Sequence, residues 1–208
     1  MAISVRGKFV TFEGAEGSGK STQINLIYEL LQKKHKDILN VREPGGVKIS
    51  ESIRDILLDV KNKKMTSECE TLLYMAARSQ LVDEVIEPAL KAGRIILCDR
   101  FLDSTVVYQG YGAGVDVEFI KKIGSFITHG ITPDLTFVFD IDPEKGFARR
   151  TRGKDRIEER PLEYHRRVRD GYLALAKQEP KRIVVIDAEK SREEIHAVVL
   201  KHVEKVLG

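Results

Sequence analysis

A glycine-rich segment near the start of the chain holds the residues with the most specific chemical signature. Residues 14–21 have the spacing G-x-x-x-x-G-K-[ST], in which glycines let backbone N–H groups surround a phosphate at the N-terminus of a helix. In such a loop the lysine, here Lys20, reaches the β- and γ-phosphates of a nucleoside triphosphate, and the hydroxyl of Ser21 is placed to bind Mg²⁺. We therefore expect a triphosphate to contact Gly14, Ala15, Glu16, Gly17, Ser18, Gly19, Lys20, Ser21 and Thr22.

A second polar pair, Asp99-Arg100, follows the largely apolar run of residues 94–98. Such a run is typical of a buried parallel strand, so both side chains should emerge at the carboxyl end of a sheet, where open α/β sheets bind ligands. An acid at this position can organise Mg²⁺, directly or through water, and the neighbouring arginine suits a phosphate. The alternative interpretation is a structural salt bridge.

Further cations and aromatic rings have spacings that indicate a second ligand. Tyr74 and Arg78 are four residues apart, so on a helix they share a face and could hold a flat ring by stacking and hydrogen bonding. Thr105, Tyr108 and Gln109 likewise gather on one helical face. With two more arginines, these side chains indicate a second substrate that carries both a phosphate and a ring. The set comprises Arg54, Tyr74, Arg78, Arg100, Thr105, Tyr108 and Gln109.

The elements that must position these residues follow from periodicity. Apolar runs predict strands at residues 9–12, 38–41, 94–98, 135–140 and 182–186, and helical spacing follows at residues 20 onward, 50–59, 67–92, 143 onward, 164–176 and 191–207. The 67–92 helix should begin at a Ser67 cap and be kinked or divided by Pro88. Alternating strands and helices predict an α/β fold, a five-stranded parallel sheet with helices on both faces in three α/β/α layers.

Composition excludes several classes of protein. The 208 residues fit one domain, and 35 basic against 32 acidic residues give a net charge of +3, which does not indicate a nucleic-acid partner. The start of the chain lacks the long apolar run of a signal peptide, and no run of about 18 apolar residues that could span a membrane occurs. We therefore expect a cytoplasmic protein without a membrane partner. The two cysteines, Cys69 and Cys98, lie far apart and are both expected to be buried.

Several motifs, in this order along the chain, resemble those of the bacterial thymidylate kinases. They are Phe12-Glu13-Gly14, Arg42-Glu43-Pro44-Gly45-Gly46, Asp99-Arg100-Phe101 with Asp103-Ser104-Thr105, Tyr108-Gln109-Gly110 and Asp155-Arg156-Ile157-Glu158. The resemblance covers essentially the whole chain. It implies a P-loop NTPase fold, one nucleoside monophosphate kinase domain over residues 1–208 with a lid at about 149–160, ATP as phosphoryl donor, Mg²⁺, dTMP as acceptor, and a homodimer.

The resemblance also implies roles for the substrate-binding residues. Tyr74 would stack on thymine, Arg78 and Gln109 would read its polar edge, and Thr105 would line the base pocket. On the sugar side, Glu13 would bind the 3′-hydroxyl, and Tyr108 would crowd the position of a ribose 2′-hydroxyl. The acceptor phosphate would be held by Arg54 and Arg100, with Arg42 as a helper.

The phosphate loop has no arginine, so the positive charge on the transferring phosphoryl group must come from elsewhere in the chain. Family members with an arginine in this loop use it on the transferring phosphoryl group, but here the loop offers only Glu16, Gly17 and Ser18. The resemblance then points to the lid, with Arg152 as the catalytic arginine beside Lys20 and Arg100, and Arg150 near adenine. For Mg²⁺ it implies Ser21 and Asp99. Without a family argument, the basic run 149–156 could equally be a solvated surface.

The expected reaction is in-line transfer of the γ-phosphoryl of ATP to dTMP, giving dTDP and ADP. A phosphate monoester with a second pKa near 6 is mostly a dianion at neutral pH, so no catalytic base is required, and the histidines, His165 among them, are expected at the surface. One alternative is a kinase for CMP, UMP or AMP. The other is a non-catalytic ATP-dependent regulatory protein, against which Arg54, Arg78 and Arg100 argue because such a switch needs no second phosphate site.

Overall fold

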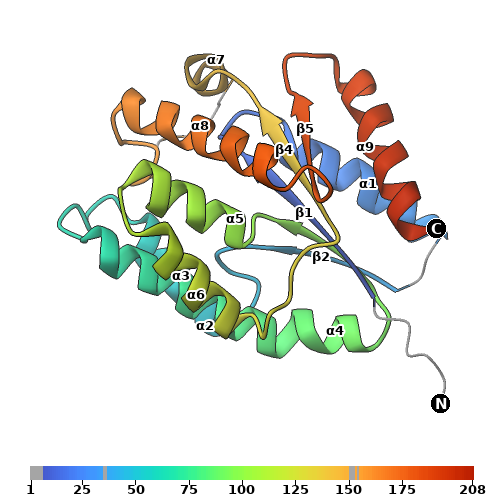
Figure 1. Cartoon of the computed structure of the whole chain (residues 1–208), viewed down its shortest axis with the longest axis horizontal. Coiled ribbons are helices and arrows are strands. Elements are labelled where there is room, and N and C mark those ends of the chain that lie inside the picture. The colour runs from blue at the N-terminus through green and yellow to red at the C-terminus, as the bar shows by residue number, and fades with distance from the viewer. Residues whose placement is uncertain (1–6, 35–36, 150–152, 154) are drawn as a thin grey trace.

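Five parallel strands form the centre of the computed structural model, which describes residues 7–34, 37–149, 153 and 155–208 (Figure 1). Their order in the sheet is β2-β3-β1-β4-β5, and every neighbouring pair is parallel. The predicted sheet is confirmed. The strands are β1 (Lys8–Gly14), β2 (Ile38–Arg42), β3 (Ile95–Asp99), β4 (Leu135–Asp140) and β5 (Ile183–Asp187).

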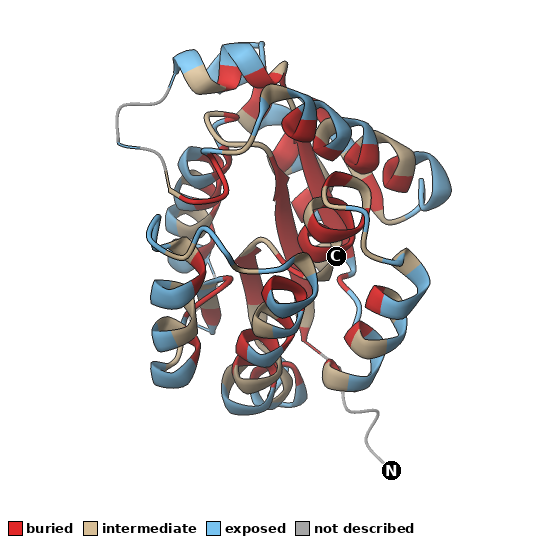
Figure 2. Ribbon diagram, turned by 90° about the vertical axis from the view of Figure 1, so that its left-hand side faces the viewer, coloured by how far each residue is buried: buried red, intermediate tan, exposed pale blue. Residues whose placement is uncertain are grey.

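Alternate side chains of the central strands face two different helical layers. Phe12 and Phe137 lie in a core shared with one layer, whereas Phe9 and Ile96 lie in a core on the opposite face. The first layer consists of α1 (Lys20–Lys34) and α9 (Arg192–Leu207) (Figure 1). Buried positions accordingly concentrate on the sheet and on the inward faces of the helices (Figure 2). Both faces of β1 and β4 are therefore buried, and the buried hydroxyls of Thr11 and Thr136 on these strands bond to each other.

The second layer contains the helix predicted at residues 67–92. It is divided into α3 (Ser67–Leu81), the π-helical segment η1 (Val82–Ile86) and α4 (Glu87–Lys91). The N–H of Glu87 bonds to the carbonyl of Val82, so the wider turn directly precedes Pro88, which could not continue a regular helix without a clash. The predicted Ser67 cap is wrong by one residue, because Thr66 accepts the hydrogen bond from the N–H of Cys69.

The remaining helices complete the same side of the sheet. One of them, α6, was not predicted and begins at an Asp116 cap. Cys98 is buried in β3 as expected, but Cys69 is exposed because it lies in the first turn of α3 on the solvent side. No helix in the described ranges is long and apolar enough to cross a membrane. The helices are α2 (Lys48–Leu58), α5 (Leu102–Thr105), the π-helical η2 (Val106–Gly112), α6 (Val117–Ile127), α7 (Pro143–Ala148) and α8 (Leu162–Gln178).

The register of the sheet brings the polar motifs together. Phe12 pairs with Asp99, and Asp99 pairs with Arg42, so these three residues form one row near the carboxyl edge. The chain segments that follow them, the glycine-rich loop after β1 and the turns at Glu43 and Arg100, therefore leave the sheet side by side. This edge is where the candidate site lies.

Candidate active site

The glycine-rich loop between β1 and α1 has a backbone that only glycine adopts without strain. Gly17 and Gly19 have φ values of 72° and 86°, in the left-handed region. A Cβ on Gly17 would also lie 2.0 Å from the carbonyl oxygen of Gly146 in α7, so the loop and α7 are in direct backbone contact. The loop thus leaves its N–H groups around an open centre at the N-terminus of α1.

Lys20 lies within this loop rather than in solvent. Its side chain is buried, and Nζ donates to the carbonyl of Ala15 at 3.2 Å, which folds the lysine back over the loop. Burial lowers the pKa of Lys20 below its usual value, and the positive charge of Arg100 adds to this effect. An anionic phosphate in the loop would relieve both effects, so the geometry suits the predicted phosphate contact.

Ser21 and Asp99 meet at the start of α1. The Ser21 hydroxyl donates to Oδ2 of Asp99 at 3.2 Å. The other carboxylate oxygen, Oδ1, is buried and has no hydrogen-bond partner among the described residues. A hydroxyl and an unsatisfied carboxylate oxygen beside a phosphate loop are the oxygen donors that Mg²⁺ uses, so these residues fit the ion.

Arg100 extends from the end of β3 toward the loop. Its φ of 71° is unusual for a residue other than glycine, and its N–H bonds to the carbonyl of Phe12 at 3.0 Å. The guanidinium donates to Oε1 of Glu16 at 2.7 Å and lies 5.1 Å from the ring centroid of Tyr108. This strained turn therefore places a cation between the phosphate loop and the second group of predicted residues.

Arg78 is buried in that second group and almost fully engaged by the chain. Nε donates to Glu43 at 2.7 Å, and Nη2 donates to the carbonyl of Phe101 at 3.0 Å and to Thr105 Oγ1 at 2.9 Å. Within the described ranges, Nη1 has only the sulfur of Met75 at 3.5 Å, a weak acceptor, so this group can donate to a ligand. Burial raises the pKa of Glu43 to about 7, although the attraction of Arg78 opposes the rise.

These residues line one open pocket, with about 820 Å³ of empty space when the solvent-filled mouth is included. Tyr74 lines it half-buried, and Gln109 faces it with a buried Oε1 that has no hydrogen-bond partner in the described part of the chain. The wall comprises Ala15, Glu16, Glu43, Pro44, Arg54, Leu58, Tyr74, Arg78, Arg100, Ser104, Thr105, Tyr108, Gln109, Pro143, Phe147, Asp155, Ile157, Glu158 and His165.

Comparison with known proteins assigns this arrangement to a family. The family model described as thymidylate kinase matches residues 12–199. A thymidylate kinase from Pelotomaculum thermopropionicum is 47% identical to the chain, over 98% of the chain and 95% of the relative. A thymidylate kinase from an Exiguobacterium species is 48% identical, over 94% of the chain and 93% of the relative. The crystal structure of thymidylate kinase from Ehrlichia chaffeensis matches with a TM-score of 0.79 and 34% identity, over 95% of this chain and 99% of that one.

The chain belongs to the thymidylate kinase family. The family predicted from the sequence motifs is thereby confirmed, as is the P-loop NTPase fold. Enzymes of this family use ATP with Mg²⁺, which accords with the phosphate loop and with the donor pair of Ser21 and Asp99.

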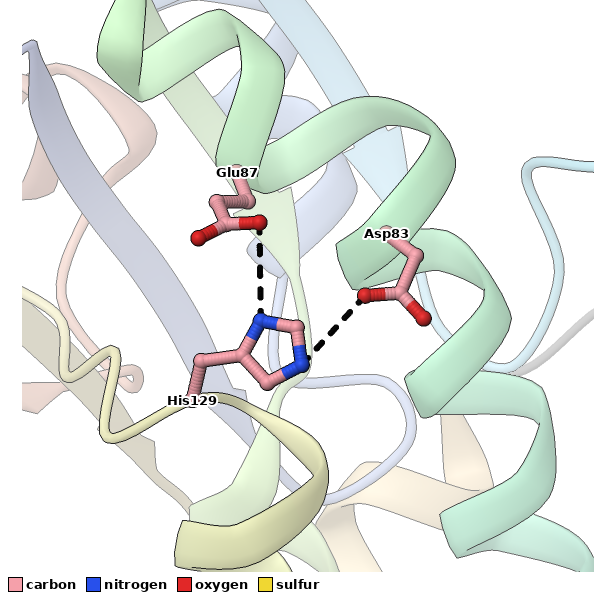
Figure 3. Close-up of side chains that lie close together, drawn as sticks. All are labelled: Asp83, Glu87 and His129. Atoms are coloured by element: carbon pink, nitrogen blue, oxygen red, sulfur yellow. Dashed lines mark ion pairs between the residues drawn. The ribbon is translucent and has the colours of Figure 1, made fainter.

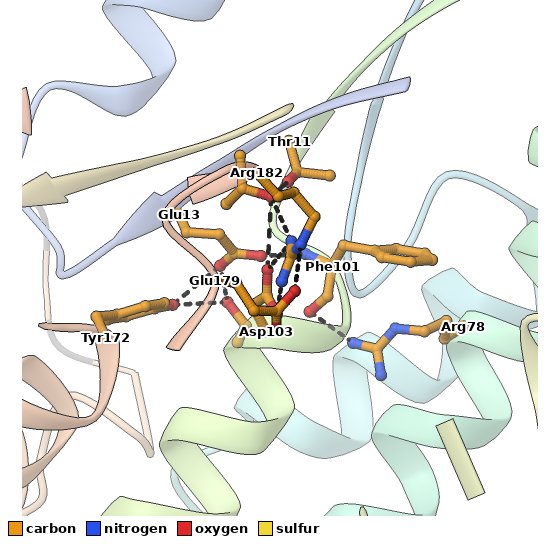
Figure 4. Close-up of polar contacts among 10 residues, drawn as sticks. Thr11, Glu13, Arg78, Phe101, Asp103, Tyr172, Glu179 and Arg182 are labelled. Carbon is orange, nitrogen blue, oxygen red and sulfur yellow. Dashed lines mark hydrogen bonds and ion pairs between the residues drawn. The ribbon is translucent and has the colours of Figure 1, made fainter. Parts of the chain in front are cut away.

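In this thymidylate kinase family member, Glu13 does not lie at the pocket wall, where the sequence-based role requires it. Its Oε1 accepts from the N–H of Phe101 at 2.7 Å, and its Oε2 accepts from the hydroxyls of Ser104 and Tyr172 (Figure 4). Burial, reinforced by the nearby charge of Asp103, raises the pKa of Glu13 to about 7. Because these internal donors occupy both oxygens, Glu13 braces the Arg100 turn, and Glu16 is the loop carboxylate that reaches the pocket.

Arg42 is also absent from the pocket wall. Its exposed guanidinium pairs with Glu51 at 3.0 Å and donates to the carbonyl of Pro44 at 3.1 Å. Arg54 donates to the same carbonyl at 2.9 Å but does line the pocket. The two arginines therefore share one backbone anchor, and only Arg54 faces the pocket.

Asp103, next to the predicted Thr105, faces the sheet instead of the pocket. Its carboxylate accepts from Nη1 and Nη2 of Arg182 at 2.7 and 3.1 Å (Figure 4). Arg182 in turn is held by Glu179 and by Thr136 on β4. This two-point pair joins α5 to the start of β5 and fixes the helix that carries Ser104 and Thr105.

Part of the pocket wall was missed in the sequence. His165, expected at the surface, is buried between the rings of Phe147 at 4.7 Å and Tyr164 at 5.2 Å. It precedes Val168 by three residues and Tyr172 by seven, so its helical spacing was a signal of burial. The other missed wall residues are Glu43, Pro44, Leu58, Ser104, Pro143, Phe147, Asp155, Ile157 and Glu158.

The predicted lid arginines, Arg150 and Arg152, lie outside the described residues. On one flank, Arg149 donates to the carbonyl of Ala188 at 2.8 Å, which directs its guanidinium to the turn after β5. On the other flank, the N–H of Asp155 donates to Glu158 at 3.0 Å, and both residues line the pocket. The two described flanks thus lie at the turn after β5 and at the pocket wall.

Outside the pocket, Asp83, Glu87 and His129 form the only group of histidine and carboxylate ligand atoms within 4.8 Å of one another in the described ranges (Figure 3). Nε2 of His129 is 3.5 Å from Asp83, and Nδ1 is 3.4 Å from Glu87. Each ring nitrogen faces its own carboxylate, so the contacts of the imidazole with the two side chains account for the group. These contacts join η1 and α4 to the turn after α6.

Proposed function

We propose that this chain transfers the γ-phosphoryl group of ATP to dTMP, giving ADP and dTDP, a step in dTTP synthesis. The observation that carries the proposal is the second half of the pocket. Beside the phosphate loop, Arg54 and Arg100 offer cations for an acceptor phosphate, and Tyr74 and Arg78 offer a ring face and a hydrogen-bond donor. A nucleotide switch has no use for this second set.

The hydrogen-bonding groups of the pocket match the thymine edge. Thymine presents an accepting O4 beside a donating N3–H, whereas cytosine presents a donating amino group beside an accepting N3. Nη1 of Arg78 is a donor, and the unpartnered Oε1 of Gln109 is an acceptor. This order complements thymine and opposes cytosine. Tyr74 supplies the stacking face, and Thr105 holds Arg78 in place.

We assign the sugar contacts to Glu16 and Tyr108. Glu16 reaches the pocket, so the hydroxyl contact expected of Glu13 passes to Glu16. The Tyr108 ring under Arg100 occupies space beside the sugar, which favours deoxyribose.

The chemistry needs alignment and charge rather than a base. The acceptor phosphate, a dianion at neutral pH, attacks directly when Arg54 and Arg100 hold it in line with the γ-phosphoryl group. Lys20 and the N–H groups of the loop hold the triphosphate. Mg²⁺, with Ser21 and Asp99 as its protein donors, supplies further neutralisation of phosphate charge. We propose that residues 1–208 act as one domain in which residues 149–160 close as a lid and exclude water.

A panel of acceptors tests the proposal. ADP release from Mg-ATP is measured with dTMP, dUMP, CMP, UMP and AMP in parallel. We expect dTMP to have the highest kcat/KM and dUMP to be roughly 10- to 200-fold lower, because one buried methyl group is worth about 1–3 kcal/mol. Equal efficiency with dUMP would contradict the base pocket. Turnover of CMP or AMP without dTMP would assign another kinase activity, and no ADP release with any acceptor would favour the regulatory alternative.

We further propose that the protein is a cytoplasmic homodimer. Apolar side chains are exposed on three helices of one side, with Ile49 and Ile56 on α2, Leu72 on α3 and Phe126, 82% exposed, on α6. The helix α3 contacts both α2 and α6 (Figure 1). An apolar face of this kind marks an interaction surface. Light scattering should give twice the 23.5 kDa chain mass, and Leu72→Glu with Phe126→Ser should give one chain mass. A wild-type protein that scatters light as a single chain would contradict the dimer. Cell fractionation tests the cytoplasmic location.

A further inference from the structure

Glu70 is a fully buried carboxylate that does not touch the pocket, yet it contacts a residue that does. It lies on α3, one helical turn before Tyr74, and its side chain has no exposed surface. Oε1 accepts a hydrogen bond from Nε2 of Gln109 at 2.8 Å. Oε2 lies 2.6 Å from Nη2 of Arg156 and 2.7 Å from Nη2 of Arg160. One carboxylate thus faces one amide and two arginines.

The contact with Gln109 decides which end of the amide faces the pocket. Oε1 of Glu70 accepts from Nε2 of Gln109, and Oε2 lies against two guanidinium groups, so both oxygens of the carboxylate meet hydrogen-bond donors. The amino group of Gln109 therefore points to Glu70, so the carbonyl oxygen of this pocket-lining residue is turned away from Glu70. That oxygen is buried and has no hydrogen-bond partner among the described residues, so it is left to accept from a ligand.

The two arginines fix Glu70 itself. Nε of Arg156 donates to the carbonyl of Leu57 at the end of α2, and Arg160 stacks 4.5 Å from the ring centroid of Tyr164 on α8. Neither arginine lines the pocket, whereas Ile157 beside Arg156 does. Glu70 is consequently held from two sides and cannot rotate away from Gln109 without leaving buried cations unpaired.

We propose that Glu70 is a positioning residue that sets the base preference by holding the Gln109 amide with its carbonyl toward the base. The inference rests on the proposed function, in which Gln109 reads the base edge. A free glutamine amide can turn through 180° and exchange donor for acceptor, and a donor at this place would pair with N3 of cytosine. The Glu70→Gln variant replaces the carboxylate by a neutral amide that can both donate and accept, so it would allow either orientation of Gln109.

The test uses two acceptors that share sugar, phosphate and methyl group and differ only in the base edge. These are dTMP and the 5′-monophosphate of 5-methyl-deoxycytidine. We expect the wild type to prefer dTMP, and Glu70→Gln to narrow the ratio of kcat/KM values by about tenfold, the effect of one mispaired buried hydrogen bond. Glu68→Gln is the matched control, because it makes the same change at an exposed glutamate of α3 and leaves the contact between Glu70 and Gln109. Its ratio should equal that of the wild type.

The outcomes separate the two proposals. A folded Glu70→Gln enzyme with the wild-type ratio overturns the role of Glu70. Absence of discrimination in the wild type instead overturns the base pocket on which that role depends. If the single variant unfolds because two arginines lose their counter-charge, the double variant Glu70→Gln with Arg160→Gln removes one charge of each sign and carries the same test. A general loss of kcat with an unchanged ratio indicates a merely structural role.

Discussion

Replacement of Arg152 by alanine is expected to lower kcat by roughly 10³- to 10⁵-fold, the range of an arginine that stabilises the transferring phosphoryl group. The physical reason lies in the phosphate loop. The positive φ of Gly17 and the nearby carbonyl of Gly146 exclude a side chain at position 17. Glu16 is paired with Arg100, so the loop cannot contribute an arginine of its own. The helix α7 that touches the loop leads directly into residues 149–160.

Two matched variants make this result specific. Arg149→Ala removes a guanidinium that is bound to Ala188, so its kcat should stay within a few-fold of the wild type. Arg150→Ala should raise the KM for ATP more than it lowers kcat, because this residue is assigned to adenine. Single-turnover measurements of dTDP formation would compare all three. A near wild-type rate in Arg152→Ala would place the catalytic charge on another residue.

Lys20→Met is expected to lower kcat by roughly 10²- to 10³-fold, as is usual when one preorganised charge in an active site is lost. Lys20 is buried over the loop, and its anchor to Ala15 uses one of three N–H donors, which leaves two for phosphate oxygens. Since the substitution replaces a buried charged side chain by an apolar one of similar length, the fold should persist, and thermal unfolding checks this.

Lys33→Met, at the exposed end of the same helix, is the control and should keep the wild-type rate. Steady-state ADP release with saturating dTMP and ATP measures both variants. Equal rates in Lys20→Met and Lys33→Met would contradict the assignment of the phosphate loop.

The sequence determined those features that depend on local spacing. The phosphate loop and the Asp99-Arg100 pair lie at the predicted edge of the sheet, and the Tyr74-Arg78 pair lies on a predicted helix, because a motif of a few residues specifies both its chemistry and its backbone. Pairings across the chain were not predictable in this way. Glu13 and Glu16 are only three positions apart in the sequence. The folded chain is needed to show that Phe101, Ser104 and Tyr172 donate hydrogen bonds to the carboxylate of Glu13.

Glu70 illustrates the same limit more strongly. It is 39 positions from Gln109 and 90 from Arg160, and although Tyr74 follows one helical turn later, nothing in the local spacing points to these two partners. Burial of a glutamate in a helix becomes predictable only when its partners are placed in space. The division of the 67–92 helix is an intermediate case, because Pro88 indicated an interruption but not the π-helical turn that accommodates it.

The close backbone contact between the phosphate loop and α7 has an evolutionary consequence. A side chain at Gly17 would strike the carbonyl of Gly146, and a side chain at Gly146 would come within 2.5 Å of the carbonyl of Glu16. Because each clash is with backbone, a side chain at either position would force the loop and α7 apart. A descendant of this protein could acquire an arginine at position 17 only after α7 had moved outward. As long as α7 stays in contact with the loop, the proposed catalytic arginine has to come from residues 149–160.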